Sequence, residues 1–306
     1  MSEQKANSDA AEITVPLRKY ITFANDSDGA HQLYVATFNC LAPRYSTPEA
    51  FPKINPAYLR FSHRFPLLMQ EIKQANADIL CLQEVDEDVI SMIAAELGRT
   101  FVNISFDCNV GDSDPLKLAI FWRKNQFSMI KAQALMLDEE SSKRVRGMHV
   151  RLVLPGNVKR FDVVNLHLKS KPENDEVRAQ ELATMKKILF EQNIFNNNTA
   201  LILAGDFNSV PTSKSIGSLF NWAYSFKEAH AGTDDDCTLP DTPPTSAKFR
   251  NDTKYCLVSD YLFYCGKVRA LAYLRRFDAR DKSDYLLPTE DYGSDHLLTA
   301  AKFELY

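Results

Sequence analysis

Short apolar runs that end in a polar residue recur along the chain and predict buried strands. Residues 33–39 are apolar on both alternating faces and end in Asn39, and residues 78–84 repeat this pattern and end in Glu84. Apolar residues on both faces are typical of a central strand that is covered on each side. Residues 58–75, between the two runs, carry leucine and isoleucine at helical spacing, so we expect a strand, a helix and a second strand in that order.

The rest of the chain also alternates between strand-like and helix-like segments. Four strand-like runs in the middle predict a meander, and they cover residues 118–122, 127–137, 148–154 and 161–168. Further helices are expected at residues 88–97 and 176–190, and further strands at residues 200–203, 257–264 and 297–303. Residues 230–254 show little periodicity and predict a long loop.

These elements indicate an α/β fold of two packed sheets flanked by helices, with polar strand ends gathered at one end of the sandwich. The chain has 306 residues, of which 45% are hydrophobic and 25% charged, and this length can bury one large core. No interior segment has the composition of a linker, so we expect one domain over residues 31–306. Residues 1–30 are polar and rich in small residues, and we expect a flexible tail there.

Composition narrows the class of protein. The six cysteines contain no CxxC pair, and Cys40, Cys81 and Cys265 lie in strand-like apolar runs, as expected for buried thiols in a reducing compartment rather than a zinc site. No apolar stretch approaches the ~20 residues that span a bilayer, and no secretion signal is recognisable, so we expect a cytoplasmic protein with no membrane partner. The net charge of -4 argues against broad electrostatic binding to long nucleic acid, although a local basic cleft is compatible with it.

The segment Gly205-Asp206-Phe207-Asn208 directly follows the apolar run at residues 200–203. A buried strand that ends in this way presents a carboxylate and an amide where water and ligands can reach them. A turn rich in Asp and Asn that merely closes a strand is the alternative interpretation. Residues at the other strand ends favour the first interpretation.

Acids, amides and imidazoles also stand at other strand or loop ends. Each is a weak signal alone, because a strand-end Asp or Asn usually caps a turn and a lone His is more often a core residue than a catalyst. Together they supply hard oxygen ligands without a thiolate, which suits Mg²⁺ or Mn²⁺, and imidazoles that can hold a phosphoryl oxygen. The residues are Asn39, Glu84, Asn165, His167, Asp206, Asn208, Asp260, Asp295 and His296.

In their order along the chain, these motifs resemble those of the endonuclease/exonuclease/phosphatase superfamily, whose members have the deoxyribonuclease I-like fold. The resemblance extends over residues 33–305 and implies a four-layer α/β/β/α sandwich of two packed mixed sheets flanked by helices. The matching motifs are Phe38-Asn39, Leu82-Gln83-Glu84-Val85, Asn165-Leu166-His167-Leu168, Gly205-Asp206-Phe207-Asn208, Ser259-Asp260-Tyr261 and Ser294-Asp295-His296.

Two longer stretches are similar to the deadenylase branch that includes nocturnin, Angel and the carbon-catabolite-repressor nucleases. One is residues 38–42 with the arginine-bearing segment 58–64, and the other is residues 167–171 with Arg178-Ala179-Gln180, which is most similar to nocturnin. The leucine-rich repeats of the repressor enzyme are absent from the sequence. Residues 116–118 read Leu-Lys-Leu where this branch usually has Asp-Gly-Cys, so the pocket wall is expected to differ there.

The resemblance implies roles in metal binding and in activation of water. Glu84, with Asn39 and Asp295, would bind Mg²⁺ or Mn²⁺, and whether a second ion binds stays open. Asp206 would orient or deprotonate the attacking water, while Asn208 would hold that water in line with phosphorus.

It also implies roles around the phosphoryl group. His296, oriented by Asp260, would stabilise the negative charge that grows on the phosphoryl oxygens. His167 and Asn165 would hold the phosphate from the leaving-group side.

Five further residues are candidates for substrate binding. Lys169, Lys171 and Arg250 could face one anionic ligand, with solvated surface charge as the alternative for each. Tyr255 and Pro172 occupy positions where deadenylases stack adenine on an aromatic or prolyl ring.

The leading functional hypothesis is a Mg²⁺-dependent 3′-to-5′ exoribonuclease that acts on adenine-rich RNA 3′ ends and releases 5′-nucleotides. The alternatives are a nocturnin-like NADP(H) 2′-phosphatase, a 2′,5′-phosphodiesterase and an RNA-end phosphatase, all of which would share the chemical step. A catalytically inactive RNA-binding scaffold is the alternative outside the enzymes, and a monomer is the default oligomeric state.

Overall fold

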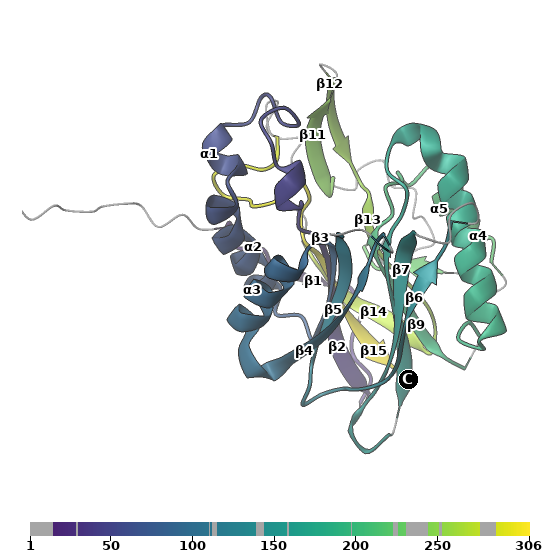
Figure 1. Cartoon of the computed structure of the whole chain (residues 1–306). Helices are drawn as coiled ribbons and strands as arrows, with labels where there is room; N and C mark the ends of the chain where they lie inside the picture. The colour runs from purple at the N-terminus through teal and green to yellow at the C-terminus, as the bar shows by residue number, and fades with distance from the viewer. Residues whose placement is uncertain are drawn as a thin grey trace, which may run out of the picture.

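The protein consists of two β-sheets packed face to face, with helices on both outer surfaces (Figure 1). The structure is a computed structural model. It describes residues 15–28, 30–109, 111, 115–138, 144–157, 159–196, 198–222, 226–230, 244–250, 253–275 and 286–306, without the side chains of residues 157, 248–250 and 253–255.

The first sheet joins the amino-terminal and carboxy-terminal parts of the chain. Its seven strands have the order β1-β14-β15-β2-β3-β5-β4, and β2 and β3 run parallel while the other neighbours run antiparallel. The strands are β1 (Tyr20–Thr22), β2 (His31–Asn39), β3 (Ile79–Val85), β4 (Phe101–Asp107), β5 (Lys117–Arg123), β14 (Val268–Leu274) and β15 (Thr299–Leu305).

The second sheet is built from the middle of the chain. Its six strands have the order β10-β13-β9-β8-β7-β6, with β8 and β9 parallel and the other neighbours antiparallel. The strands are β6 (Ser128–Met136), β7 (Val145–Val153), β8 (Arg160–His167), β9 (Ala200–Asp206), β10 (Lys227–Glu228) and β13 (Asp260–Gly266). A separate hairpin of β11 (Ser246–Arg250) and β12 (Thr253–Leu257) rises beside β13 (Figure 1).

Helices cover the outer face of each sheet because each carries an apolar stripe. Leu68, Ile72 and Ile93 pack on Phe38 and Phe121 of the first sheet. The helices at residues 175–191 and 214–220 pack on the second sheet through residues that include Leu182 and Leu219. The helices are α1 (Pro56–Leu59), α2 (Phe61–Ala75), α3 (Glu87–Leu97), α4 (Asp175–Glu191) and α5 (Lys214–Phe220), and the 3₁₀ turns are Pro43–Tyr45, Gly98–Thr100, Pro155–Asn157 and Pro172–Asn174.

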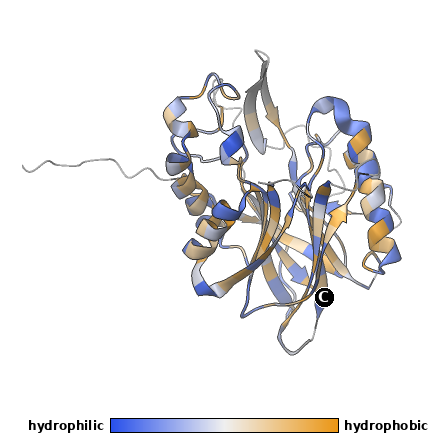
Figure 2. Ribbon diagram, in the orientation of Figure 1, coloured by the Kyte–Doolittle hydropathy of each residue, from blue (hydrophilic) through white to orange (hydrophobic). Residues whose placement is uncertain are grey.

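The largest core lies between the sheets, as the apolar runs predict. Val35, Ile120, Val163, Ile202 and Phe303 are each fully buried in this inner cluster. The strands are largely hydrophobic and the helices alternate between hydrophobic and hydrophilic residues (Figure 2). The expected four-layer α/β/β/α arrangement is therefore confirmed.

Three expectations about individual segments are wrong. The expected meander continues only through β6, β7 and β8, because β5 belongs to the other sheet. The expected helix at residues 58–75 is divided into α1 and α2 at Arg60, whose ψ of 133° is extended. Part of the expected loop at residues 230–254 is the strand β11; residues 231–243 and 251–252 lie outside the described part.

The expected flexible tail also differs from the structure where it is described. Tyr20–Thr22 forms β1, which pairs with β14 at the edge of the first sheet. The Val15 side chain is buried, and its backbone N–H donates to Oε1 of Gln70 at 2.8 Å. Residues 1–14 and 29 lie outside the described part of the chain.

Two compositional expectations can be compared with the fold. Cys40, Cys81 and Cys265 are buried free thiols, and burial raises the pKa of each. Within the described ranges, no helix combines the length and the apolar character needed to cross a bilayer.

Candidate active site

Two parallel strand pairs, one in each sheet, bring their carboxyl ends to the same end of the sandwich. In the first sheet, Asn39 pairs in register with Gln83, the residue before Glu84. In the second sheet, His167 pairs with Asp206, and Asp260 of the antiparallel neighbour is also opposite Asp206. The topology therefore places these polar side chains together, at a position where α/β folds commonly bind ligands.

Glu84 is turned toward this end by an irregularity of its strand. The β3–β5 register shifts between Leu82 and Val85, and Glu84 has a φ of 52°, which a side-chain-bearing residue rarely adopts. Its Oε1 accepts a hydrogen bond of 3.0 Å from Nδ2 of Asn39. The carboxylate remains 16% exposed, so it is accessible to a ligand.

Asp206 depends on the glycine before it. Gly205 has a φ of 149°, and a Cβ at this position would lie 2.1 Å from the Leu166 carbonyl oxygen, so only glycine allows β9 to lie this close to β8. Oδ1 of Asp206 accepts a hydrogen bond of 2.8 Å from the backbone N–H of Asn208. Oδ2 accepts one of 3.1 Å from Nδ2 of Asn39, so Glu84 and Asp206 share one amide group.

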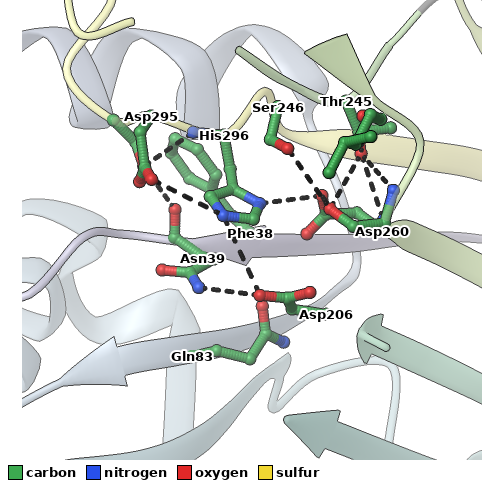
Figure 3. Close-up of polar contacts among 12 residues, drawn as sticks. Phe38, Asn39, Gln83, Asp206, Thr245, Ser246, Asp260, Asp295 and His296 are labelled. Atoms are coloured by element: carbon green, nitrogen blue, oxygen red, sulfur yellow. Dashed lines mark hydrogen bonds and ion pairs between the residues drawn. The ribbon is translucent and has the colours of Figure 1, made fainter. Parts of the chain in front are cut away.

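His296 lies among three carboxylates (Figure 3). Its Nδ1 is 2.8 Å from Oδ2 of Asp260, and its Nε2 is 3.8 Å from Oδ2 of Asp206 and 3.9 Å from Oδ2 of Asp295. Burial alone would lower the pKa of the imidazole, but Asp260, Asp295 and Asp206 together raise it to about 10. These carboxylates favour the protonated form of the ring, and Nε2 lies at nearly equal distances from Asp206 and Asp295.

His167 also lies near both Glu84 and Asp206. Its Nε2 is 3.7 Å from Oε1 of Glu84 and 3.8 Å from Oδ2 of Asp206, and its side chain is 17% exposed. Glu84, Asp206, His167 and His296 therefore converge, although they come from both sheets.

The chemistry of these side chains fits a divalent cation. Glu84 and Asp206 hold two like charges on one amide, and a bound cation would remove their repulsion. One ligand atom each from Asp206, Asp260 and His296 also lie within 4.8 Å of one another. We assign that second group to charge stabilisation, because Nδ1 of His296 bonds Asp260 and this contact orients the ring.

Two predicted site residues have a different environment from the expected one. Asn165 is fully buried, and its Nδ2 donates to the carbonyls of Leu82 and Ala119 across the sheet interface. It therefore joins the two sheets beneath the site and is not brought to the cluster. The side-chain oxygen of Asn39 accepts from the Leu41 N–H, so the amide nitrogen, rather than the predicted metal-ligating oxygen, faces the carboxylates.

The predicted substrate-binding residues are only partly described. Lys169, Lys171 and Pro172 follow His167 in the segment directly after β8, with Lys171 and Pro172 exposed. Arg250 and Tyr255 lie on β11 and β12, and their side chains are outside the described part.

Two buried arginines hold loops of the site, and the sequence reasoning gave neither a role. The fully buried Arg64 donates to the carbonyls of Cys40, Leu41 and Gly293, and so joins the loop after Asn39 to the loop before His296. Its position on the apolar face of α2 was the available signal, since a buried charge must be paired or hydrogen-bonded. Arg178 binds backbone carbonyls of residues 168–174 in a similar way, and we call this segment the lysine loop because it carries Lys169 and Lys171.

Thr245 is a third overlooked residue. Its Oγ1 accepts from the backbone N–H groups of Ser259 and Asp260, at 2.9 and 3.1 Å. Because the segment around it was expected to be an irregular loop, the sequence pattern gave no signal for it.

This fold and site are those of a known class of phosphoester-cleaving proteins. Residues 36–296 match the profile described as the Endonuclease/Exonuclease/phosphatase family, and the chain belongs to that family.

Within the family, the chain is similar to the Ccr4, Angel and nocturnin branch. It is 27% identical to a probable CCR4-Not complex 3′-5′-exoribonuclease subunit Ccr4 from Enterocytozoon bieneusi over 88% of this chain and 63% of that protein. It is 24% identical to the Ccr4 subunit of Candida albicans over 64% of this chain and 29% of that protein. The chain thus spans less than two thirds of these curated relatives.

Solved structures of the same branch share the fold. The crystal structure of ANGEL2, a 2′,3′-cyclic phosphatase, in complex with adenosine-2′,3′-vanadate superposes with a TM-score of 0.77 at 21% identity, covering 95% of this chain and 99% of that chain. The human Nocturnin catalytic domain with a bound sulfate gives a TM-score of 0.72 at 20% identity, covering 96% and 100%.

Proposed function

We propose that the protein is a divalent-metal-dependent phosphodiesterase that removes nucleotides from the 3′ end of adenine-rich RNA. The observation that carries this proposal is the convergence of Glu84, Asp206, His167 and the Asp260–His296 pair. The similarity to Ccr4 exoribonuclease subunits supports RNA as the substrate.

Glu84 is the residue best placed to hold the metal ion, and Asp295 remains a predicted ligand. When bound, Mg²⁺ or Mn²⁺ would offset negative charge on the phosphoryl group and help to orient it. Asn39 contributes by fixing the Glu84 carboxylate at 3.0 Å.

Asp206 and Asn208 act on the attacking water. The Asn208 N–H fixes Oδ1 of Asp206, and Nδ2 of Asn208 donates to the Leu168 carbonyl at 3.1 Å. The φ of Asn208 is 50°, so its backbone is in a conformation that the surrounding contacts must maintain. Asp206 can then orient the water and accept its proton as the water attacks phosphorus.

His296 and His167 act on the phosphoryl oxygens. Asp260 fixes the His296 ring, and the protonated Nε2 donates a charged hydrogen bond that strengthens as negative charge develops in the transition state. His167, held by neither carboxylate at less than 3.7 Å, is free to contact the same group from the leaving-group side.

The direct test uses oligoadenylate labelled at its 5′ end, incubated with purified protein and either Mg²⁺ or a chelator. Progressive shortening with release of 5′-AMP, in the Mg²⁺ reaction only, is the expected result. Binding of the oligonucleotide without turnover would instead favour the scaffold alternative.

A second candidate is a phosphatase that acts on RNA ends. The superposition with ANGEL2, described as a 2′,3′-cyclic phosphatase, covers 99% of that chain and favours this candidate. An oligoadenylate that ends in a 2′,3′-cyclic phosphate separates the two functions, because the phosphatase would open and release that phosphate without shortening the chain. A parallel reaction with NADPH tests the predicted 2′-phosphatase alternative by release of inorganic phosphate.

A further inference from the structure

The loop after β8 carries both predicted substrate-binding lysines and is held from below by α4. Lys169 is partly buried and Lys171 is exposed. The Lys169 N–H donates to Oε2 of Glu181 at 2.9 Å, and Glu181 is within 3.4 Å of Arg146. The backbone of this loop is therefore attached to the helix, while the side chain of Lys171 is exposed and that of Lys169 is partly exposed.

Arg178 makes most of this attachment. Its side chain is 3% exposed; Nη1 donates to the carbonyls of Lys169 at 3.0 Å and Lys171 at 2.7 Å, and Nη2 donates to that of Pro172 at 3.4 Å. A guanidinium offers five N–H donors in one rigid plane, so it can bind several carbonyls at once, which lysine cannot reproduce.

Lys171 shows why such a clamp is needed. Its φ is 79°, a backbone region that costs a non-glycine residue roughly 1–3 kcal/mol and persists only where surrounding contacts enforce it. The Lys171 carbonyl accepts both from Arg178 and from the Asn174 N–H at 3.1 Å. These bonds hold the residue in the strained conformation and thereby fix where its side chain leaves the backbone.

The fourth bond of Arg178 reaches the neighbouring loop, which has anchors of its own. Nε donates to Oγ of Ser209 at 2.7 Å. Ser209 also bonds Ser215 through Oγ at 2.7 Å, and its carbonyl accepts from the Tyr261 hydroxyl at 2.8 Å. Loss of the guanidinium is therefore expected to disturb the lysine loop more than the loop that carries Asp206.

We infer that Arg178 is a positioning residue that fixes Lys169 and Lys171 to receive the phosphates of an oligoanionic substrate. The inference rests on the proposed function, because it assigns the two lysines to the phosphates beyond the scissile bond. A small phosphodiester occupies only the scissile position, so the effect of Arg178 depends on the length of the substrate.

The test compares Arg178→Lys with the unaltered chain by three measurements. Amide hydrogen exchange of residues 168–174 reports whether the loop is held, and we expect it to accelerate at least ~10-fold. The Kd for a fluorescent oligoadenylate, measured with a chelator so that nothing is hydrolysed, should rise ~10-fold, while kcat on bis(p-nitrophenyl) phosphate with Mg²⁺ stays within ~3-fold.

Arg151→Lys is the matched control. Arg151 on β7 donates to both carboxylate oxygens of Asp162 on β8, at 2.9 and 3.1 Å. Both residues belong to the second sheet, from which the lysine loop also leaves, but these bonds do not involve that loop. Arg151→Lys should change the melting temperature without changing either exchange at residues 168–174 or the Kd. In a Lys169→Ala/Lys171→Ala background, Arg178→Lys should no longer change the Kd, because the groups that it positions are gone.

If amide exchange at residues 168–174 is unchanged in Arg178→Lys, Arg178 does not hold the loop. If exchange is faster but the Kd is unchanged, the loop is held but has no role in substrate binding. Equal losses on the long and the small substrate would show that Arg178 acts on the chemistry instead. If the unaltered protein neither binds nor shortens oligoadenylate, the proposed function and the role of the lysines fail, while hydrogen exchange still decides whether Arg178 holds the loop.

Discussion

At the scale of single residues, the site consists of ionisable side chains whose burial would cost free energy if their partners were removed. His296 is almost fully buried, yet three nearby carboxylates raise its pKa to about 10. Asp206 and Glu84 share the amide of Asn39, so each carboxylate depends on a donor supplied by another strand. Such groups act on developing charge, and their removal should affect turnover more than folding.

Replacement of Asp206 or His296 by alanine should lower kcat at least ~10²-fold, because both side chains act in the transition state. Steady-state rates on oligoadenylate, together with thermal melting of each variant, check this expectation. Asp162→Asn alters a buried carboxylate that pairs with Leu201, toward the other end of β8 from His167, and bonds His149 and Arg151, so it should leave the rate per folded molecule unchanged. Full activity in either alanine variant would remove the roles assigned here.

A second residue-scale prediction concerns Glu71, a buried carboxylate on α2 that lies 3.2 Å from Arg18. Burial raises the pKa of Glu71 to about 7, above its ordinary value of 4.5, although Arg18 acts in the opposite direction. A raised folded-state pKa means that the stabilising contribution is complete below the unfolded pKa and is lost as the pH rises through about 7. Glu71→Gln should therefore flatten the decline of unfolding free energy between about pH 4.5 and 7.

Glu304→Gln provides a control of opposite sign. Burial alone would raise the pKa of Glu304, but hydrogen bonds from Ser27 and Arg269 lower it, so its contribution is lost as the pH falls instead. Denaturant unfolding at a series of pH values measures both effects. Parallel profiles for Glu71→Gln and the unaltered chain would refute the assignment.

At the scale of elements, the sequence predicted the strands that end in the site but not all of their surroundings. The buried runs around Asn39, Glu84 and Asp206 are apolar on both faces, so their pattern alone identified them as central strands. Edge strands such as β1 and β4 escaped notice because one face is exposed and their runs are short or mixed. Sheet membership of β5 also depends on packing, which periodicity does not encode.

The candidate site, too, could be predicted from the sequence only in part. Residue types and order identified the cluster, whereas the inward turn of Asn165 and the amide orientation of Asn39 arise from contacts with other strands. The partners of Arg64 and Arg178 could not be predicted either, because both bind backbone carbonyls, which carry no sequence signature, although the place of Arg64 on an apolar helix face indicated that it needs partners.

The close approach of β8 and β9 gives a prediction for Gly205. Gly205→Ala would place a Cβ 2.1 Å from the Leu166 carbonyl oxygen and should destabilise the protein by at least ~2 kcal/mol, with loss of activity. Gly217→Ala is the control, since nothing lies within 4 Å of a Cβ there and an alanine in helix α5 is expected to stabilise by up to ~1 kcal/mol. Equal unfolding midpoints for the two variants would contradict this account.

At the scale of the whole molecule, the site lies where the two sheets meet. Glu84 belongs to β3 of the first sheet, His296 lies in the loop before β15 of that sheet, and His167, Asp206 and Asp260 belong to the second sheet. A cation bound at Glu84 would stabilise the folded state, because unfolding would separate the segments that form the site.

Mg²⁺ should accordingly raise the melting temperature. A ligand that binds only the folded state increases the unfolding free energy by RT ln(1 + [L]/Kd), which is about 2.7 kcal/mol when the ligand concentration is 100 times Kd. Differential scanning fluorimetry with Mg²⁺ or a chelator measures the shift. Glu84→Ala should abolish most of it, whereas Glu96→Ala, an exposed acid on α3, should retain it. A full shift in the Glu84 variant would exclude this residue as the main ligand.

The contacts between the two sheets also determine how the protein should lose activity at low denaturant concentrations. Backbone ladders run within each sheet, but the bond from Asn39 to Asp206 crosses from one sheet to the other, and the bond between His296 and Asp260 joins the loop before β15 to the second sheet. A slight slide of the layers would break these crossing bonds before any ladder opens, since side-chain alignment tolerates less displacement than sheet pairing does. Inactivation is therefore expected at denaturant concentrations that leave the circular dichroism spectrum unchanged.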